Sequence, residues 1–324
     1  MMEQNKKVLF ISPIFFDYYK NIIDAIQRNF NYEVTWYADR PSEHFIDKAV
    51  IRINRKILAR KNNRYFKKIK ESCIKNKYDY VFVIFGQFLN HYYIRELRNL
   101  LPNTKFIYYT WDSSCIYSVI DDIANEFDVK YSFDLEDTKK GFKFLSLFYS
   151  NEIISSSIEY DAVSIFTVKP GKMLNYEKIK AHLPSDIKIY EYLYIQSRLV
   201  FRFYKIKYKA EFKKYKMKDF KYKKLSREET NLLCSKAKTI IDCQMMKQNG
   251  LTIRTFETLN LKKKLITTNN NILNYDFYNE NNIRVVTDEM IDNNFFESSF
   301  DETMDITKYS IDNFVKKIFS DYSI

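Results

Sequence analysis

The chain has 324 residues, 46% of them hydrophobic, which is enough for two domains of about 150 residues with buried cores and excludes disordered and fibrous classes. It contains only four glycines, and no two of them lie within 25 residues of each other, so it lacks both G-x-G-x-x-G and G-x-x-x-x-G-K-[ST]. Nicotinamide dehydrogenases and P-loop NTPases are therefore disfavoured.

Short apolar runs rich in Val, Ile, Phe and Tyr alternate with longer helical patterns along the chain. The runs predict strands at 7–12, 33–37, 80–85, 105–110, 129–133, 162–168, 187–192, 238–242, 264–268 and 283–287. The patterns between them predict helices at 17–30, 43–76, 90–100, 134–141, 173–182, 195–218, 226–236, 252–261 and 308–320. Continuous apolar strands that alternate with helices are typical of parallel sheets covered on both faces.

The alternation occurs twice, with a serine run at 155–157 between the halves. We therefore predict an α/β protein with two Rossmann-like, doubly wound domains, 1–155 and 156–305, that face a cleft. Residues 306–324 are expected to form a helix that could pack back on the first domain. Ligands of open parallel sheets bind beyond the carboxyl ends of the strands, so the loops there are the places to search.

Three of the four glycines, Gly86, Gly171 and Gly250, lie in loops that follow predicted strands. Gly141 instead ends a helical stretch and fits a helix C-cap. The backbone at Gly250 and Leu251 opens a predicted helix, which makes it a ready site for a diphosphate. Thr252 could cap this helix, and Arg254 places a cation in its first turn, where the helix dipole disfavours it.

The segment 235–286 resembles the nucleotide-sugar half of GT-B glycosyltransferases, and it is most similar to bacterial enzymes that build lipopolysaccharide and capsule. The resemblance rests on Gly250-Leu251, on Glu257 in the following helix, and on the strand and turn 265–269, which read Leu-Ile-Thr-Thr-Asn. The stretch 131–150 also resembles the end of the amino-terminal domain of that group. The resemblance implies that the first domain binds the acceptor and the second binds the donor.

The resemblance also implies a donor site. Its residues would be Lys169, Gly171, Lys172, Gln248, Asn249, Gly250, Leu251, Thr252, Arg254 and Glu257. In this interpretation Glu257 accepts hydrogen bonds from the ribose hydroxyls. The alternative is a helix-surface acid paired with Arg254. For Lys169 and Lys172 the alternative is a pair of exposed lysines in a turn.

An inverting transfer needs a group that takes the acceptor proton, whereas a retaining one, by resemblance, relies on the leaving diphosphate. Asp112, beside Trp111, and Asp17 are the candidates, because both follow predicted strands of the first domain. Asp17 could instead cap the helix that starts there. The acid clusters 121–122 and 134–137 fall at expected helix starts, so we assign them structural roles and predict neither a metal site nor a cofactor.

The net charge of +12 is concentrated in two segments. Residues 48–70 hold ten cations and no acid, and residues 198–224 hold twelve cations, two acids and eight aromatic rings. Cations interleaved with bulky apolar residues suit an anionic membrane surface. There are two alternatives: the segments bind nucleic acid, or they are solvated helix faces whose aromatic side chains face the core. Neither a membrane-spanning run nor a signal peptide is evident, which predicts a cytoplasmic, peripheral membrane protein.

These observations predict a metal-independent glycosyltransferase that moves a sugar from a nucleotide-sugar to a glycan acceptor, expected to be lipid-linked, in surface polysaccharide synthesis. No nucleic acid is expected as a partner. Two alternatives stay open: a polyol-phosphate transferase of cell-wall polymer synthesis, and a non-catalytic nucleic-acid-binding protein.

Overall fold

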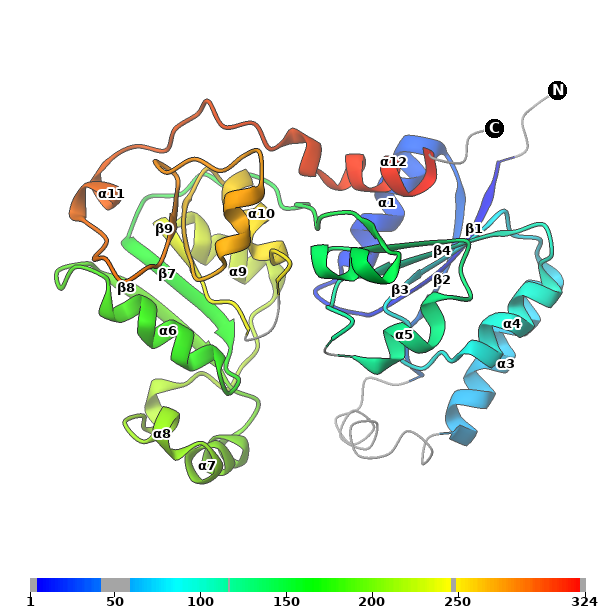
Figure 1. Ribbon diagram of the computed structural model, residues 1–324, viewed down its shortest axis with the longest axis horizontal. Helices are drawn as coiled ribbons and strands as arrows, with labels where there is room; N and C mark the ends of the chain where they lie inside the picture. Colours follow the sequence, from blue (N-terminus) through cyan, green and yellow to red (C-terminus); the bar gives the residue numbers. More distant parts are fainter. Residues whose placement is uncertain (1–4, 42–58, 116, 246–248, 321–324) are drawn as a thin grey trace. The chain divides into compact units, whose positions relative to one another are not determined.

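A computed structural model describes residues 5–41, 59–115, 117–245 and 249–320. The chain divides into two compact units. Unit 1 comprises residues 1–146 with 311–324, and unit 2 comprises residues 147–310. Each unit contains a parallel sheet with helices packed around it (Figure 1).

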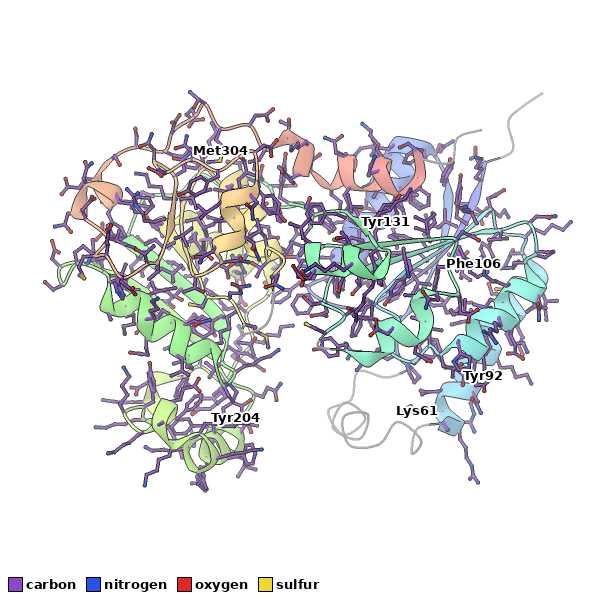
Figure 2. The ribbon with its side chains drawn as sticks, in the orientation of Figure 1. Lys61, Tyr92, Phe106, Tyr131, Tyr204 and Met304 are labelled. Atoms are coloured by element: carbon purple, nitrogen blue, oxygen red, sulfur yellow. The ribbon has the colours of Figure 1, made fainter. Side chains whose placement is uncertain are left out.

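The sheet of unit 1 has the strand order β2-β1-β3-β4-β5-β6, and all pairs are parallel. Its strands are β1 (Lys7–Ser12), β2 (Glu33–Ala38), β3 (Tyr80–Ile84), β4 (Lys105–Thr110), β5 (Val129–Ser132) and β6 (Lys143–Phe144). Every residue of β3 is buried, as expected of a central strand covered on both faces. Phe106 and Tyr131 belong to this core (Figure 2).

The helices of unit 1 are α1 (Tyr18–Phe30), α3 (Ala59–Lys75), α4 (His91–Leu100), α5 (Ser118–Ala124), the 3-10 turn η2 (Leu135–Lys140) and α12 (Ile311–Ser320). The last helix returns from the far end of the chain and packs beside α1. Arg28 pairs with Asp312 at 2.6 Å, and the Phe319 ring lies 5.7 Å from that of Phe82. Unit 1 is thus closed by residues from both ends of the sequence.

The sheet of unit 2 has the strand order β11-β10-β9-β7-β8, again parallel throughout. Its strands are β7 (Tyr160–Thr167), β8 (Ile189–Tyr194), β9 (Ala237–Asp242), β10 (Lys264–Thr267) and β11 (Ile283–Val285). Its helices and 3-10 turns are α6 (Lys172–Ala181), α7 (Arg198–Lys207), α8 (Lys209–Phe212), η3 (Met217–Asp219), α9 (Arg227–Ser235), α10 (Ile253–Asn260), η4 (Asn270–Asn274), α11 (Asn293–Glu297) and η5 (Thr307–Tyr309).

The ten predicted strands all form, with ends within two residues of the prediction. The single helix predicted over 195–218 is wrong, because the chain breaks after Tyr208 into α7, α8 and η3. The break folds the segment back on itself, so that the rings of Phe201 and Phe220 lie 5.0 Å apart. Burying these aromatics outweighs the continuation of one helix. Gly141 caps η2 with φ +80°, which confirms its predicted role.

Of the helix predicted over 43–76, residues 42–58 lie outside the described part and the remainder forms α3. No helix among the described residues has the length and apolar character that a membrane crossing requires.

Candidate active site

Two loops of unit 2 meet at the carboxyl edge of its sheet. Strands β9 and β10 are parallel neighbours, and their last residues, Asp242 and Thr267, pair in register. The loops that follow them therefore start side by side. The backbone N–H of Gln244 in the first loop donates to the hydroxyl of Thr268 in the second at 3.4 Å. The first of these loops leads to the described donor-site residues predicted at 249–257.

The turn that opens α10 is held by two asparagines from the loop after β10. The side-chain amide of Asn269 donates to the carbonyl oxygens of Asn249 at 3.1 Å and Gly250 at 3.3 Å. Asn271 adds a bond to the Asn249 carbonyl at 2.9 Å. The structure thus joins the two halves of the predicted signature, the Gly250-Leu251 pair and the Thr-Thr-Asn turn. Gln248 lies outside the described residues.

Thr252 stands at the start of α10 but makes no side-chain cap. Its hydroxyl donates instead to the carboxylate of Asp242, and the Thr255 hydroxyl lies 3.5 Å from the same oxygen. Thr252 thus occupies the predicted N-cap position, but its side chain does not cap the helix because a buried carboxylate competes for the hydroxyl. The Thr252 side chain therefore does not occupy the backbone N–H groups of the first turn of α10. An anion binds a helix start through such N–H groups. Asp242 was not among the predicted site residues, although an acid at the end of a buried strand is a signal for such a role.

Glu257 lies within α10 and is only 1% exposed, so it is not a helix-surface acid. Its carboxylate oxygens lie 3.6 Å from Arg227 Nε and 3.5 Å from a terminal nitrogen of Arg254. The two guanidinium groups compensate the buried negative charge. Arg227, from the first turn of α9, had no signal in the sequence.

The loop after β7 brings Gly171 to the start of α6 with φ +82°, a conformation that L side chains rarely adopt. The Gly171 N–H donates to both carboxylate oxygens of Glu211, at 2.9 and 3.1 Å. Glu211 comes from α8 and is 9% exposed. A side-chain anion therefore occupies the start of α6, where the resemblance implies donor phosphate.

The two lysines of this loop contact different neighbours. The Lys169 amine lies 3.5 Å from the sulfur of Met245, in the loop after β9. The Lys172 amine lies 5.1 Å from the centre of the Phe166 ring. Both side chains are half-buried, so the alternative of two exposed lysines does not describe them. The Lys169 contact thus reaches the loop after β9, which leads to Gly250.

Asp17 and Asp112 follow β1 and β4 at the carboxyl edge of the sheet in unit 1. Asp17 is exposed, makes no side-chain cap to α1, and pairs with Lys20 at 3.3 Å. Side-chain capping of α1 therefore does not explain why an acid stands at position 17. Asp112 is half-buried, and its loop is held by the Thr110 hydroxyl, which donates to the Asp112 carbonyl at 2.5 Å and accepts its N–H at 3.2 Å.

Left-handed backbone follows the neighbouring strands β1 and β3. Phe16 and Asp17 have φ of 48° and 55°, and Phe85 and Gly86 have φ of 65° and 68°. Each non-glycine residue in this region costs about 1–2 kcal/mol. Such strain clusters at ligand-binding sites, which favours this edge as a binding site.

A buried network of serines and aspartates lies beside Asp112. Ser113 donates to Asp134, while the hydroxyls of Ser114 and Ser132 donate to Asp137 at 2.5 and 2.6 Å. The five side chains are all buried, so these bonds satisfy carboxylates that would otherwise be costly. Asp134 and Asp137 thus anchor the loop that carries Asp112. Within the described ranges, His, Cys, Asp and Glu form no group of three or more that could hold a metal ion.

A cavity of about 220 Å³ in unit 2 lies away from these residues. It is lined by lysines at the amino ends of β9 and β10, including Lys238 and Lys264. Lys238 pairs with Asp161 at 2.9 Å, and Lys264 donates to the carbonyl of Phe295 at 2.7 Å. These lysines have structural partners at the opposite edge of the sheet, so we do not assign them to the donor site.

Comparison with protein-family models finds no match, and comparison with curated proteins finds none either. Solved structures do match the chain over nearly its whole length. The apo structure of OtsA is 11% identical with a TM-score of 0.62, and the match covers 99% of each chain. HepE from Anabaena in complex with UDP-glucose is 9% identical with a TM-score of 0.56, and covers 98% of this chain and 99% of that one.

A UDP-N-acetylglucosamine 2-epimerase is 9% identical with a TM-score of 0.51, over 98% of this chain and 95% of that one. At these identities the likeness shows a shared fold. It confirms the predicted fold class, two Rossmann-like domains with parallel sheets of the GT-B kind.

Proposed function

We propose that the chain is a glycosyltransferase that moves a sugar from a nucleotide-sugar donor to a glycan acceptor. The observation that carries the proposal is the carboxyl edge of unit 2. There Asn269 holds the turn at Gly250, directly before a helix whose buried Glu257 lies between two arginines. The fold supports the same class of ligand, since structures of HepE that share it were solved with UDP, with UDP-glucose, and with UDP and glucose.

The donor would bind to unit 2. The turn 249–252 and the first amides of α10 would hold the diphosphate, together with Lys169, Gly171, Lys172 and Arg254, and Glu257 would accept hydrogen bonds from the ribose. These cations and amides would neutralise the leaving diphosphate, so the proposal assigns no step to a metal ion or cofactor. Chelation with EDTA should accordingly leave the transfer rate unchanged.

The acceptor would bind to unit 1, with Asp112 as the first candidate base and Asp17 as the second. In an inverting transfer the carboxylate takes the proton of the acceptor hydroxyl while the oxygen of that hydroxyl forms a bond to the anomeric carbon. The bond from that carbon to the phosphate oxygen breaks, and the nucleoside diphosphate leaves with the electron pair. The serine network would keep the Asp112 loop in place during this step.

The proposed acceptor also implies a cellular location for the protein. A lipid-linked glycan acceptor of surface polysaccharide synthesis would place the protein at the inner face of the cell membrane. The basic segments 48–70 and 198–224 would then hold the protein against anionic lipid, because their cations attract the negatively charged headgroups.

A panel of nucleotide-sugars, screened by thermal shift, tests the donor assignment. A ligand at 100 times its dissociation constant stabilises the protein by about 2.7 kcal/mol, a readily measured shift in melting temperature. The hit is then incubated with candidate acceptors, and product is followed by mass spectrometry. Absence of any stabilising nucleotide-sugar contradicts the proposal. Binding with conversion of the donor alone would identify an epimerase-like activity instead.

A further inference from the structure

The helices α7 and α8 form a small lobe at the margin of unit 2, beyond α6 (Figure 1). The lobe is packed through aromatic side chains: Phe201 is 2% exposed, and the Tyr204 ring, labelled in Figure 2, lies 5.3 Å from that of Phe212. Lys205 donates to the carbonyl of Tyr215 at 2.9 Å. One face of α7 is therefore fully used by the fold.

The opposite face of α7 is apolar and exposed. Leu199, Phe203 and Ile206 are 72%, 52% and 82% exposed. At about 100° per residue these positions span an arc of roughly 60°, and its centre is about 170° from Phe201. Three large apolar side chains thus form one stripe that points away from the body of the unit.

Cations flank this stripe on both sides. Helical geometry places Arg202 on one side of it and Lys207 on the other. The Lys207 amine lies 5.5 Å from the centre of the Phe203 ring, which keeps the charge next to the apolar surface. An apolar stripe between cations is the pattern of a helix that lies in the interface of an anionic membrane.

The other basic segment behaves differently. In α3 the apolar side chains Phe66 and Ile69 are buried, and the exposed face, which includes Arg60, Lys61 and Lys67, is cationic. The described part of that segment therefore offers charge without an apolar stripe. Such a face can contact lipid headgroups through charge alone, so it provides a natural comparison for α7.

We propose that α7 inserts Leu199, Phe203 and Ile206 into an anionic lipid bilayer, with Arg202 and Lys207 at the level of the headgroups. Lipid is favoured over nucleic acid because aliphatic side chains gain most by leaving water for an acyl region, whereas phosphate contacts need cations alone. The inference deepens the membrane contact proposed above for 198–224 and rests on that part of the proposed function, but it depends on the geometry of one helix and holds whether or not the chain transfers sugar.

Flotation with vesicles of phosphatidylglycerol and phosphatidylcholine tests this inference on the full-length protein. The variant Leu199→Ser/Phe203→Ser/Ile206→Ser should bind anionic vesicles at least about tenfold more weakly than the wild type. A matched control, Ile158→Ser/Leu232→Ser/Met290→Ser, removes three other exposed apolar side chains and should bind like the wild type. Melting curves of both variants establish that they are folded.

The charge contribution is tested with Arg202→Gln/Lys207→Gln, which should weaken binding to anionic vesicles more than Arg60→Gln/Lys67→Gln on α3. Equal flotation of the wild type and the α7 triple variant would overturn the inference. So would a wild type that shifts an oligonucleotide but not vesicles, or a triple variant whose only change is loss of a protein dimer on gel filtration. Nucleotide-sugar binding, measured in the same samples, reports separately on the proposed function.

Discussion

The carboxylate of Glu211 accepts the backbone N–H of Gly171 at the start of α6, with distances of 2.9 and 3.1 Å. A negative side chain therefore occupies a position that favours anions. If the donor diphosphate binds at this helix start, it must displace the Glu211 carboxylate or bind beside it.

Glu211→Gln tests this competition. The amide keeps the shape of the side chain but loses its charge, so a nucleoside diphosphate that binds the wild type should bind the variant about three- to tenfold more tightly. Calorimetry measures the change, and Glu177→Gln, an acid on α6 paired with Lys214, serves as the control. Weaker binding by Glu211→Gln would mean that Glu211 supports the site rather than competing for it.

Asn269→Ala should destabilise unit 2 by about 1–3 kcal/mol, because it leaves the carbonyl oxygens of Asn249 and Gly250 without their buried donor. Asn271→Ala removes one bond to Asn249 from a half-buried residue and should cost less. Urea denaturation gives both values. Donor affinity should fall in the same order, and equal effects of the two substitutions would contradict the role given to Asn269.

Gly86→Ala should be more damaging than Gly141→Ala, although both glycines have positive φ. A Cβ at Gly86 would lie 3.0–3.2 Å from Leu89, Val83 and Ile123, whereas at Gly141 the nearest atom is 3.7 Å away, on Lys130. We expect a loss of about 1 kcal/mol at Gly141 from backbone strain alone, and about 2–4 kcal/mol at Gly86. Thermal denaturation that ranks the two variants in the opposite order would contradict this account.

The strands could be predicted because parallel, doubly covered strands are continuous apolar runs, as β3 shows. The two-residue β6 and the short helix α5 carry no such pattern. The helix predicted over 195–218 is longer than α7 because no glycine or proline marks the C-cap at Tyr208. Local sequence cannot report tertiary contacts either. Glu211 is 40 residues from Gly171 along the chain, and only the fold brings them together.

The family resemblance identified best those site residues that lie close together in the sequence. Gly250-Leu251 and the Thr-Thr-Asn turn are separate motifs in the sequence. The register of Asp242 with Thr267 in neighbouring strands explains why the two motifs meet in the fold. Arg227 was missed because its importance comes from its approach to Glu257, which no spacing in the sequence encodes.

The central claim is that Glu257 recognises the ribose of a nucleotide donor. The most direct measurement is calorimetry of the nucleoside diphosphate selected by the panel and of its 2′- and 3′-deoxy counterparts, with the wild type and with Glu257→Gln. A hydrogen bond to a charged group contributes about 1.5–3 kcal/mol, so the wild type should bind at least one deoxy nucleotide roughly tenfold or more weakly. The variant should bind the ribose form more weakly and lose most of that discrimination. Equal discrimination in the two proteins, with both folded, would contradict the account.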